Sequence, residues 1–226
     1  MNPLIIALDV DTTAEALRLV EEIGPAVDFY KVGMELYAVG GLPFISQLRA
    51  AGKQVFLDLK LYDISETVKR ATRQLCGRSD AAFLTVHGSR AVMRAAVEGR
   101  GNSSTQLLAV TVLTSFDQDD LADLGYSVPV AELVELRVTK AVESGMDGIV
   151  CSPLEVARVR QIAGSRVKLV TPGVRSMDAA AGDQKRVATP RQAIHDGADH
   201  LVIGRQVTRA AHPRHAAEDI LAEIAG

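Results

Sequence analysis

Eight short apolar runs, separated by helix-length segments, constrain the fold of this chain more than any other feature. Each run is rich in Val, Ile and Leu and is bounded by a polar residue, a glycine or a proline. Such runs are typical of parallel strands that are buried on both faces. The predicted strands cover residues 4–8, 29–32, 55–59, 82–86, 107–113, 148–151, 167–170 and 200–203.

The segments between the runs carry the periodicity of amphipathic helices. In the first of them, apolar side chains recur every three residues over 14–23, after a capping sequence at 11–13 and before Gly24 and Pro25. An eightfold alternation of strand and helix predicts an α/β protein with one domain, a (β/α)8 TIM barrel over residues 1–226. A doubly wound open sheet is the alternative.

Polar residues end most of the apolar runs, and in a TIM barrel the carboxyl ends of the strands carry the chemistry. Gly and Arg occur together after the last two runs, where this architecture commonly binds a phosphate, so a phosphorylated ligand is expected. Taken singly, Asp9 or Lys31 is equally consistent with a structural ion pair, and His87 with a packed imidazole. The candidate residues, in chain order, are Asp9, Lys31, Asp58, Lys60, His87, Thr114, Arg175, Gly204 and Arg205.

The third run ends in a cluster of charges. Asp58 and Lys60 are two residues apart, so they share one face of an extended strand, and Asp63 follows on the turn that opens the next helix. Uncompensated charges are costly to bury, whereas alternating signs offset one another and keep a lysine protonated. A protonated lysine suits proton donation, whereas a Schiff-base nucleophile must be neutral. We therefore expect Lys60 to be a proton donor.

At these positions the chain resembles the orotidine 5′-phosphate decarboxylase family over nearly its whole length. The order of the motifs at successive strand ends makes the resemblance specific. The chain departs from the usual family pattern at Tyr62, Ser65, Ser176 and Gln206, which all flank the charged positions. The matching elements are Ala7-Leu8-Asp9, Lys31-Val32-Gly33, Asp58-x-Lys60-x-x-Asp63-Ile64-x-x-Thr67-Val68, Thr171-Pro172-Gly173-Val174-Arg175, Gly182-Asp183-Gln184-x-Arg186 and Gly204-Arg205.

The resemblance implies that orotidine 5′-monophosphate loses carbon dioxide to give uridine 5′-monophosphate, without a metal or an organic cofactor. Lys60 would stabilise the carbanion and supply the proton, and Asp58 would lie near the substrate carboxylate. Whether repulsion by Asp58 drives the reaction is left open. The family also implies a homodimer in which Asp63 and Thr67 reach the neighbouring subunit's site.

The resemblance assigns the remaining candidates to substrate binding. Asp9 and Lys31 would hold ribose hydroxyls and orient the charged groups, Thr114 would hydrogen-bond the base, and Arg175 is a site residue by family position. Arg205, beside Gly204, would bind the phosphate. The stretch 176–186 is interpreted as a lid in which Gln184 bridges phosphate and pyrimidine.

Three other functions compete with this one. A magnesium-dependent sugar-phosphate decarboxylase or aldolase shares the Asp-x-Lys-x-x-Asp pattern, but such enzymes typically carry a glutamate where this chain has Lys31. A phosphosugar epimerase would need histidine ligands at several strand ends, and His87 is the one that qualifies. A nucleotide-binding module without activity would keep Gly204 and Arg205 but would not need the charges of the third strand.

Composition limits the classes of partner that this chain is expected to bind. The formal net charge of -3, without a basic block, argues against nucleic acid, and no stretch is long enough to span a membrane. The two cysteines, Cys76 and Cys151, lack metal spacing and are expected to be buried and unpaired, so a reducing cytoplasm is predicted. We expect the four histidines other than His87 to be solvated, namely His195, His200, His212 and His215.

Overall fold

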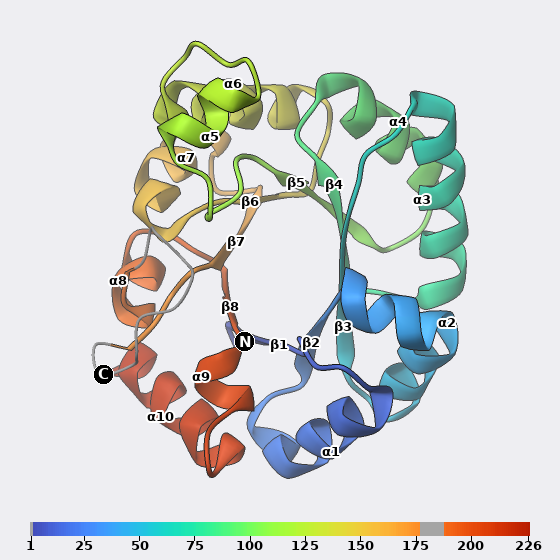
Figure 1. The fold of residues 1–226 in the computed structure, drawn as a ribbon, viewed down its shortest axis with the longest axis vertical. Coiled ribbons are helices and arrows are strands. Elements are labelled where there is room, and N and C mark those ends of the chain that lie inside the picture. The colour runs from blue at the N-terminus through green and yellow to red at the C-terminus, as the bar shows by residue number, and fades with distance from the viewer. Residues whose placement is uncertain (1, 177–187) are drawn as a thin grey trace.

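Eight parallel strands close into a barrel in the computed structural model, which describes residues 2–176 and 188–226 (Figure 1). The strands are β1 (Leu4–Ala7), β2 (Phe29–Gly33), β3 (Gln54–Leu61), β4 (Phe83–His87), β5 (Gln106–Val110), β6 (Gly148–Val150), β7 (Lys168–Pro172) and β8 (His200–Ile203). The last strand pairs with the first through the registers Leu4↔Leu201 and Ile6↔Ile203. This closure confirms the predicted TIM barrel and excludes the open sheet.

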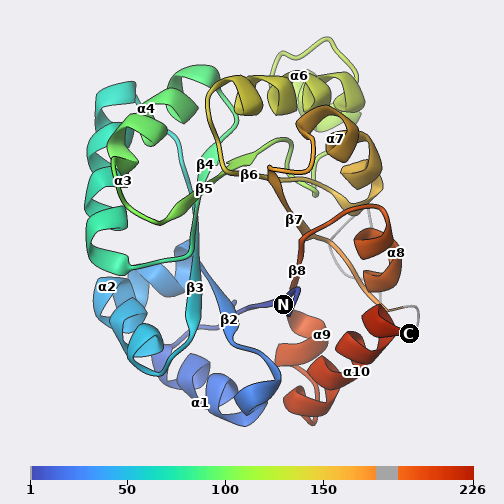
Figure 2. The same ribbon diagram turned by 180° about the vertical axis from the view of Figure 1, so that it is seen from behind.

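Helices surround the strands on the outside of the barrel, as both face-on views show (Figures 1 and 2). The first helix begins after its Thr12 cap and ends before Gly24, as the sequence predicts. The α-helices are α1 (Thr13–Ile23), α2 (Met34–Ala50), α3 (Ser65–Ser79), α4 (Arg90–Arg100), α5 (Gln118–Asp123), α6 (Val130–Glu143), α7 (Val156–Ala163), α8 (Pro190–His195), α9 (Arg205–Thr208) and α10 (Pro213–Ala225), and the 3-10 turns are η1 (Gly24–Ala26) and η2 (Pro153–Glu155). Among the described residues, none of these helices has both the length and the apolar character needed to cross a bilayer.

Alternation along each strand separates two cores. Leu4 and Ile6 of β1 pack toward the helices, whereas Ile5 and Ala7 belong to a second cluster inside the barrel. The inner cluster fills the lower barrel with apolar side chains, which are Ile5, Ala7, Phe29, Phe56, Phe83, Leu108, Val170 and Val202. Polar residues that continue the same alternation therefore lie above this apolar layer, at the carboxyl ends of the strands.

Seven of the eight strands differ from the predicted ranges at one end or both, by one to three residues, and two of these differences illustrate why. The strand predicted over 107–113 leaves the ladder after Val110, although Val112 is still buried. Apolar character continues there because Val112 and Leu113 line the central pocket, and a buried loop has the same composition as a buried strand. The seventh strand begins at Lys168 and not at 167, since the carbonyl of Val167 accepts a hydrogen bond from the Arg160 guanidinium.

The prediction of a solvated His200 is wrong, because its side chain lies inside the barrel at the start of β8. Its ring contacts Phe29 and Phe83 edge-on, with centroid separations of 5.7 and 5.4 Å. His200 and Val202 are two residues apart on β8, so their side chains point to the same, inner side of the barrel. This alternation is missed when each histidine is considered by itself. Burial lowers the pKa of His200 below its ordinary value, with Asp199 opposing this effect and Lys168 adding to it. The imidazole therefore serves as an uncharged ring in the core.

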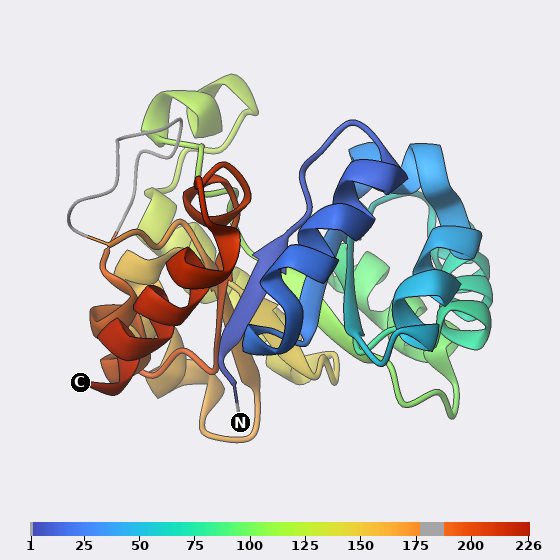
Figure 3. The same ribbon diagram turned by 90° about the horizontal axis from the view of Figure 1, so that it is seen from below.

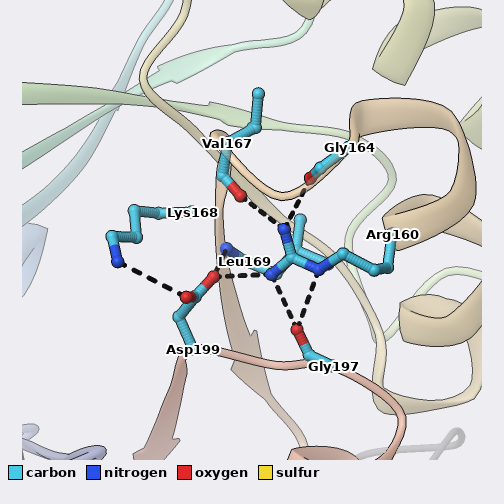
Figure 4. Close-up of polar contacts among 7 residues, drawn as sticks. All are labelled: Arg160, Gly164, Val167, Lys168, Leu169, Gly197 and Asp199. Atoms are coloured by element: carbon cyan, nitrogen blue, oxygen red, sulfur yellow. Dashed lines mark hydrogen bonds and ion pairs between the residues drawn. The ribbon is translucent and has the colours of Figure 1, made fainter.

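Ion pairs fasten the amino-terminal end of the barrel. Arg160 of α7 donates to the carbonyls of Gly164 and Gly197 at 2.7 Å and to Asp199 Oδ2 at 2.6 Å (Figure 4). Asp199 also accepts from the backbone N–H of Leu169 at 2.8 Å. Burial opposes the charged form, but this backbone bond and Arg160 outweigh it and lower the pKa of Asp199. These contacts hold together the loop between α7 and β7 and the loop between α8 and β8, at the end of the barrel opposite the polar strand ends.

Candidate active site

A pocket of about 710 Å³ opens at the carboxyl ends of the strands. In the side view, α5 rises above the barrel rim, and the amino terminus lies at the opposite end (Figure 3). Residues from nearly every strand end contribute to the wall. The pocket brings together eight of the candidates from the sequence, which are Asp9, Lys31, Asp58, Lys60, Thr114, Arg175, Gly204 and Arg205.

Four of these side chains form a chain of alternating charge across β1, β2 and β3. Lys31 Nζ lies 2.9 Å from Asp9 Oδ1 and 3.6 Å from Asp58 Oδ2. Lys60 Nζ lies 2.9 Å from the same Asp58 oxygen. Asp58 is therefore shared by two ammonium groups, and the four charges sum to zero within the pocket wall.

The charge state of Asp58 depends on both its burial and its neighbours. Its side chain is 14% exposed, whereas that of Lys60 is 29% exposed. Burial alone would raise the pKa of Asp58, but the two neighbouring ammonium groups and hydrogen bonds from Lys60 and Thr85 lower it below its ordinary value. The Asp58 carboxylate is therefore ionised at neutral pH and lies between the amino groups of Lys31 and Lys60.

Gly33 leaves room for the first ion pair. A Cβ at this position would lie 3.2 Å from Lys31 Nζ and 3.4 Å from Asp9 Oδ1. A Cβ would therefore be tight against the Lys31 ammonium and in ordinary contact with Asp9, so glycine after β2 leaves the most room for this ion pair. The Lys-x-Gly part of the sequence motif has a direct steric reason.

Arginines face the pocket from the opposite side. Arg175 follows β7, and Arg205 and Arg209 lie at the two ends of α9, after β8. Gly173 has a φ of 80°, a left-handed conformation that glycine adopts without strain, in the turn that leads to Arg175. The pocket is thus bipolar, with the ammonium and carboxylate groups over β1–β3 and the guanidinium groups beyond β7 and β8.

Two of the departures from the family pattern contact each other. Gln206 Nε2 donates to Ser176 Oγ at 2.8 Å, and Ser176 N donates to Gln206 Oε1 at 3.3 Å. Ser176 Oγ in turn donates to Glu223 Oε2 of α10 at 2.6 Å. Because Ser176 follows Arg175 and Gln206 follows Arg205, this network ties the two arginine-bearing connections together.

The remaining candidates lie elsewhere. Asp63 and Thr67 are exposed outside the pocket, and Asp63 Oδ1 accepts a hydrogen bond from the N–H of Ile64 at 2.6 Å. Within one chain, Asp63 is therefore not part of the charged chain formed by Asp58 and Lys60. Gln184 and most of the predicted lid, 177–186, lie outside the described residues.

His87 does not line the pocket of this chain, and its imidazole packs against another ring. Its ring contacts that of Tyr62 at a centroid distance of 4.9 Å. Partial burial, Arg137 and Lys60 lower its pKa. Of the two interpretations that the sequence leaves open, this packing favours the packed imidazole.

Sequence reasoning missed several polar residues at the site. Asp11, Glu35 and Arg209 line the pocket, and Thr85 of β4 hydrogen-bonds to Asp58. Thr85 had a detectable signal, because it is one of only two threonines within the predicted apolar runs, the other being Thr111. Cys76 and Cys151 are buried as predicted, and Cys151 also lines the pocket. Within the described residues, no three His, Cys, Asp or Glu side chains are arranged to hold a metal ion.

Comparisons with known proteins find similar sequences and structures over nearly the whole chain. Curated relatives named orotidine 5′-phosphate decarboxylase include one from Rhodopseudomonas palustris, which is 53% identical over 222 residues, covering 98% of this chain and 94% of the relative. Another, from Bradyrhizobium diazoefficiens, is 49% identical and covers 98% of this chain and 93% of the relative. The crystal structure of orotidine 5′-phosphate decarboxylase from Lactobacillus acidophilus matches with a TM-score of 0.88 and 35% identity over 100% of both chains.

The family model described as "Orotidine 5′-phosphate decarboxylase / HUMPS family" matches residues 2–220. This match extends from the first strand to the last helix and includes every pocket residue named above. The chain therefore belongs to the orotidine 5′-phosphate decarboxylase family.

Proposed function

We propose that Lys60 donates the proton in the reaction that family membership gives this chain, the decarboxylation of orotidine 5′-monophosphate to uridine 5′-monophosphate. The bond between the ring carbon and the carboxylate breaks, carbon dioxide leaves, and the electron pair stays on the ring carbon. An N–H proton of the Lys60 ammonium then forms the new C–H bond, and solvent reprotonates the amine. The reaction needs no oxidant or reductant.

The alternating chain of charges is the observation that carries this proposal. Asp58 is ionised and lies 2.9 Å from Lys60 Nζ, so this contact fixes the position of the lysine amino group before substrate binds. Preorganised charge aimed at a developing anion is usually the largest catalytic contribution. In the proposed complex, Asp58 lies beside the departing carboxylate.

The bipolar pocket supports one orientation of the nucleotide. We place the phosphate against Arg205 and Arg175 and the reacting carbon beside Lys60, with Asp9 and Lys31 at the ribose hydroxyls. Thr114, which lines the pocket beyond β5, would hydrogen-bond the base. Phosphate binding far from the reacting carbon can supply energy for closing the site. Gln184 keeps its expected role of bridging phosphate and base.

A metal-free assay tests the reaction directly. Purified protein treated with chelator is expected to convert orotidine 5′-monophosphate, followed by its ultraviolet absorbance, at the same rate as untreated protein. The competing magnesium-dependent sugar-phosphate decarboxylase or aldolase would lose its activity to chelator and would not accept this nucleotide. Lys31 already supplies a cation beside Asp9 and Asp58, where a magnesium ion would need further carboxylates.

Replacing Arg205 with alanine is expected to weaken binding of uridine 5′-monophosphate by about 10- to 100-fold, since a charge-assisted contact to the phosphate is lost. Inhibition by the bare nucleoside uridine should change little. Arg94, exposed on α4 and remote from the pocket, provides the matched control Arg94→Ala. Equal loss of affinity for nucleotide and nucleoside would show that Arg205 does not bind the phosphate.

We also propose that the enzyme is a homodimer in the cytoplasm whose sites are shared between subunits. Asp63 and Thr67 sit on the surface beside the exposed apolar side chains of Tyr62 and Ile64, which are 68% and 73% exposed. An apolar surface around an unused site residue fits a two-fold contact that places Asp63 in the pocket of the second subunit.

A further inference from the structure

Strand β3 contains an irregularity at the charged cluster. Its register with β4 is Leu57↔Leu84 before the irregularity and Leu61↔Val86 after it. Three residues of β3, 58–60, therefore lie opposite a single residue of β4, Thr85. Such an expansion interrupts the hydrogen-bonded ladder between the two strands and changes the direction in which side chains point. The backbone N–H and C=O groups that lose their ladder partners need other hydrogen-bond partners.

The backbone of Lys60 is unusual for a lysine. Its φ is 47°, in the left-handed region that residues with a Cβ avoid. Such a conformation persists only where surrounding contacts hold it. The contacts that hold Lys60 are therefore part of what places its ammonium group.

The hydroxyl of Thr85 supplies these contacts. The backbone N–H of Lys60 donates to Thr85 Oγ1 at 3.0 Å, and Thr85 Oγ1 donates to Asp58 Oδ1 at 3.0 Å. The carbonyl of Leu57 is a weaker acceptor for the same proton, at 3.5 Å. Thr85 is fully buried and shares the inward parity of Phe83, so its hydroxyl lies between the two ends of the expansion.

One hydroxyl thus connects the backbone of the lysine to the carboxylate that the same lysine contacts through Nζ. Asp58 Oδ1 is occupied by Thr85, while Oδ2 faces Lys60 Nζ at 2.9 Å and Lys31 Nζ at 3.6 Å. Both oxygens of Asp58 are fixed, and the carboxylate cannot rotate without breaking one of these contacts.

We propose that Thr85 is a positioning residue for proton donation: its hydroxyl fixes the left-handed turn at Lys60 and the orientation of Asp58, and so aims the ammonium group. This inference rests on the proposed function of Lys60. Thr85 does not touch the substrate in this account, so it governs turnover and not binding.

Two substitutions separate the hydroxyl from the shape of the side chain. Thr85→Val keeps the branched shape and removes both hydrogen bonds, whereas Thr85→Ser keeps the hydroxyl and removes the methyl group. We expect Thr85→Val to lower kcat by about 10- to 100-fold, because a small displacement of a reacting group is costly. KM and inhibition by uridine 5′-monophosphate should stay within about twofold. Thr85→Ser should recover most of kcat.

The control is Thr72→Val on α3, which alters a fully buried threonine whose hydroxyl has no hydrogen-bond partner among the described residues. It should leave kcat unchanged. If Thr85→Val does not fold, Thr85→Ala replaces it in the comparison with Thr85→Ser. A kcat of Thr85→Val equal to that of the unsubstituted protein, or a Thr85→Ser variant as slow as Thr85→Val, would overturn the proposal.

A crystal structure of Thr85→Val provides a readout that does not depend on activity. We expect Lys60 to leave the left-handed region and the separation of Lys60 Nζ from Asp58 Oδ2 to increase from 2.9 Å. An unchanged Lys60 backbone would refute the positioning role even if the protein had another substrate. Failure of the unsubstituted protein to decarboxylate the nucleotide would instead refute the proposed function.

Discussion

Replacing Lys60 with alanine is expected to lower kcat by about 10³-fold or more, because the substitution removes both the charge that stabilises the carbanion and the proton that quenches it. Binding of uridine 5′-monophosphate should remain measurable, since Arg205 and Arg175 at the other side of the pocket are untouched. Steady-state kinetics and competitive inhibition measure the two effects separately.

The folded state should survive this substitution. Asp58 keeps Lys31 at 3.6 Å and the hydroxyl of Thr85 at 3.0 Å, so its charge is not left uncompensated. Lys140→Ala on α6, outside the pocket, is the matched control and should retain full activity. If Lys60→Ala kept more than about a tenth of kcat, the lysine would not be the proton donor.

Mixing two inactive variants is expected to restore activity if the sites are shared. In a dimer of one Lys60→Ala chain and one Asp63→Ala chain, one site carries both substitutions and the other carries neither. Random assembly of equal amounts should therefore give about a quarter of the activity of the unsubstituted protein, because half of the dimers are mixed and each has one intact site. Co-refolding the two variants and assaying turnover measures this recovery.

Each variant alone should be slow, with Asp63→Ala reduced about 10²-fold through the loss of one charge at the reacting centre. Asp219→Ala, on α10 and outside the pocket, replaces Asp63→Ala in the control mixture. That mixture should reach about half of full activity, because every intact Lys60 site then works. A Lys60→Ala and Asp63→Ala mixture no more active than its components would contradict the shared site.

The alternation of apolar runs was sufficient to predict the barrel. Parallel strands that are buried on both faces must be rich in Val, Ile and Leu, and the crossovers between them must be helical, so both signals are local in sequence. The same logic placed Asp9, Lys31 and Arg205 at strand ends that meet above the inner core. The sequence therefore predicted well the strands, the helices and the residues at strand ends, because short-range periodicity encodes all three.

The features that escaped prediction depend on contacts between distant residues. Thr85 meets Asp58 across 27 positions, and the expansion of β3 is visible only once its register with β4 is known. The left-handed backbone of Lys60 has no signature in composition, because lysine rarely adopts it. His200 was misjudged because burial of a histidine depends on the parity of the strand that carries it.

Hydrogen exchange at the product carbon tests the role of Lys60 most directly. By microscopic reversibility, the amine that delivers a proton to the ring carbon can also remove it. Uridine 5′-monophosphate kept in D2O with the unsubstituted protein is therefore expected to gain deuterium at the carbon that carried the carboxylate, as followed by proton NMR. Lys60→Ala should give no exchange at saturating nucleotide, while Lys140→Ala exchanges normally. Equal exchange with and without the Lys60 side chain would show that Lys60 does not transfer the proton.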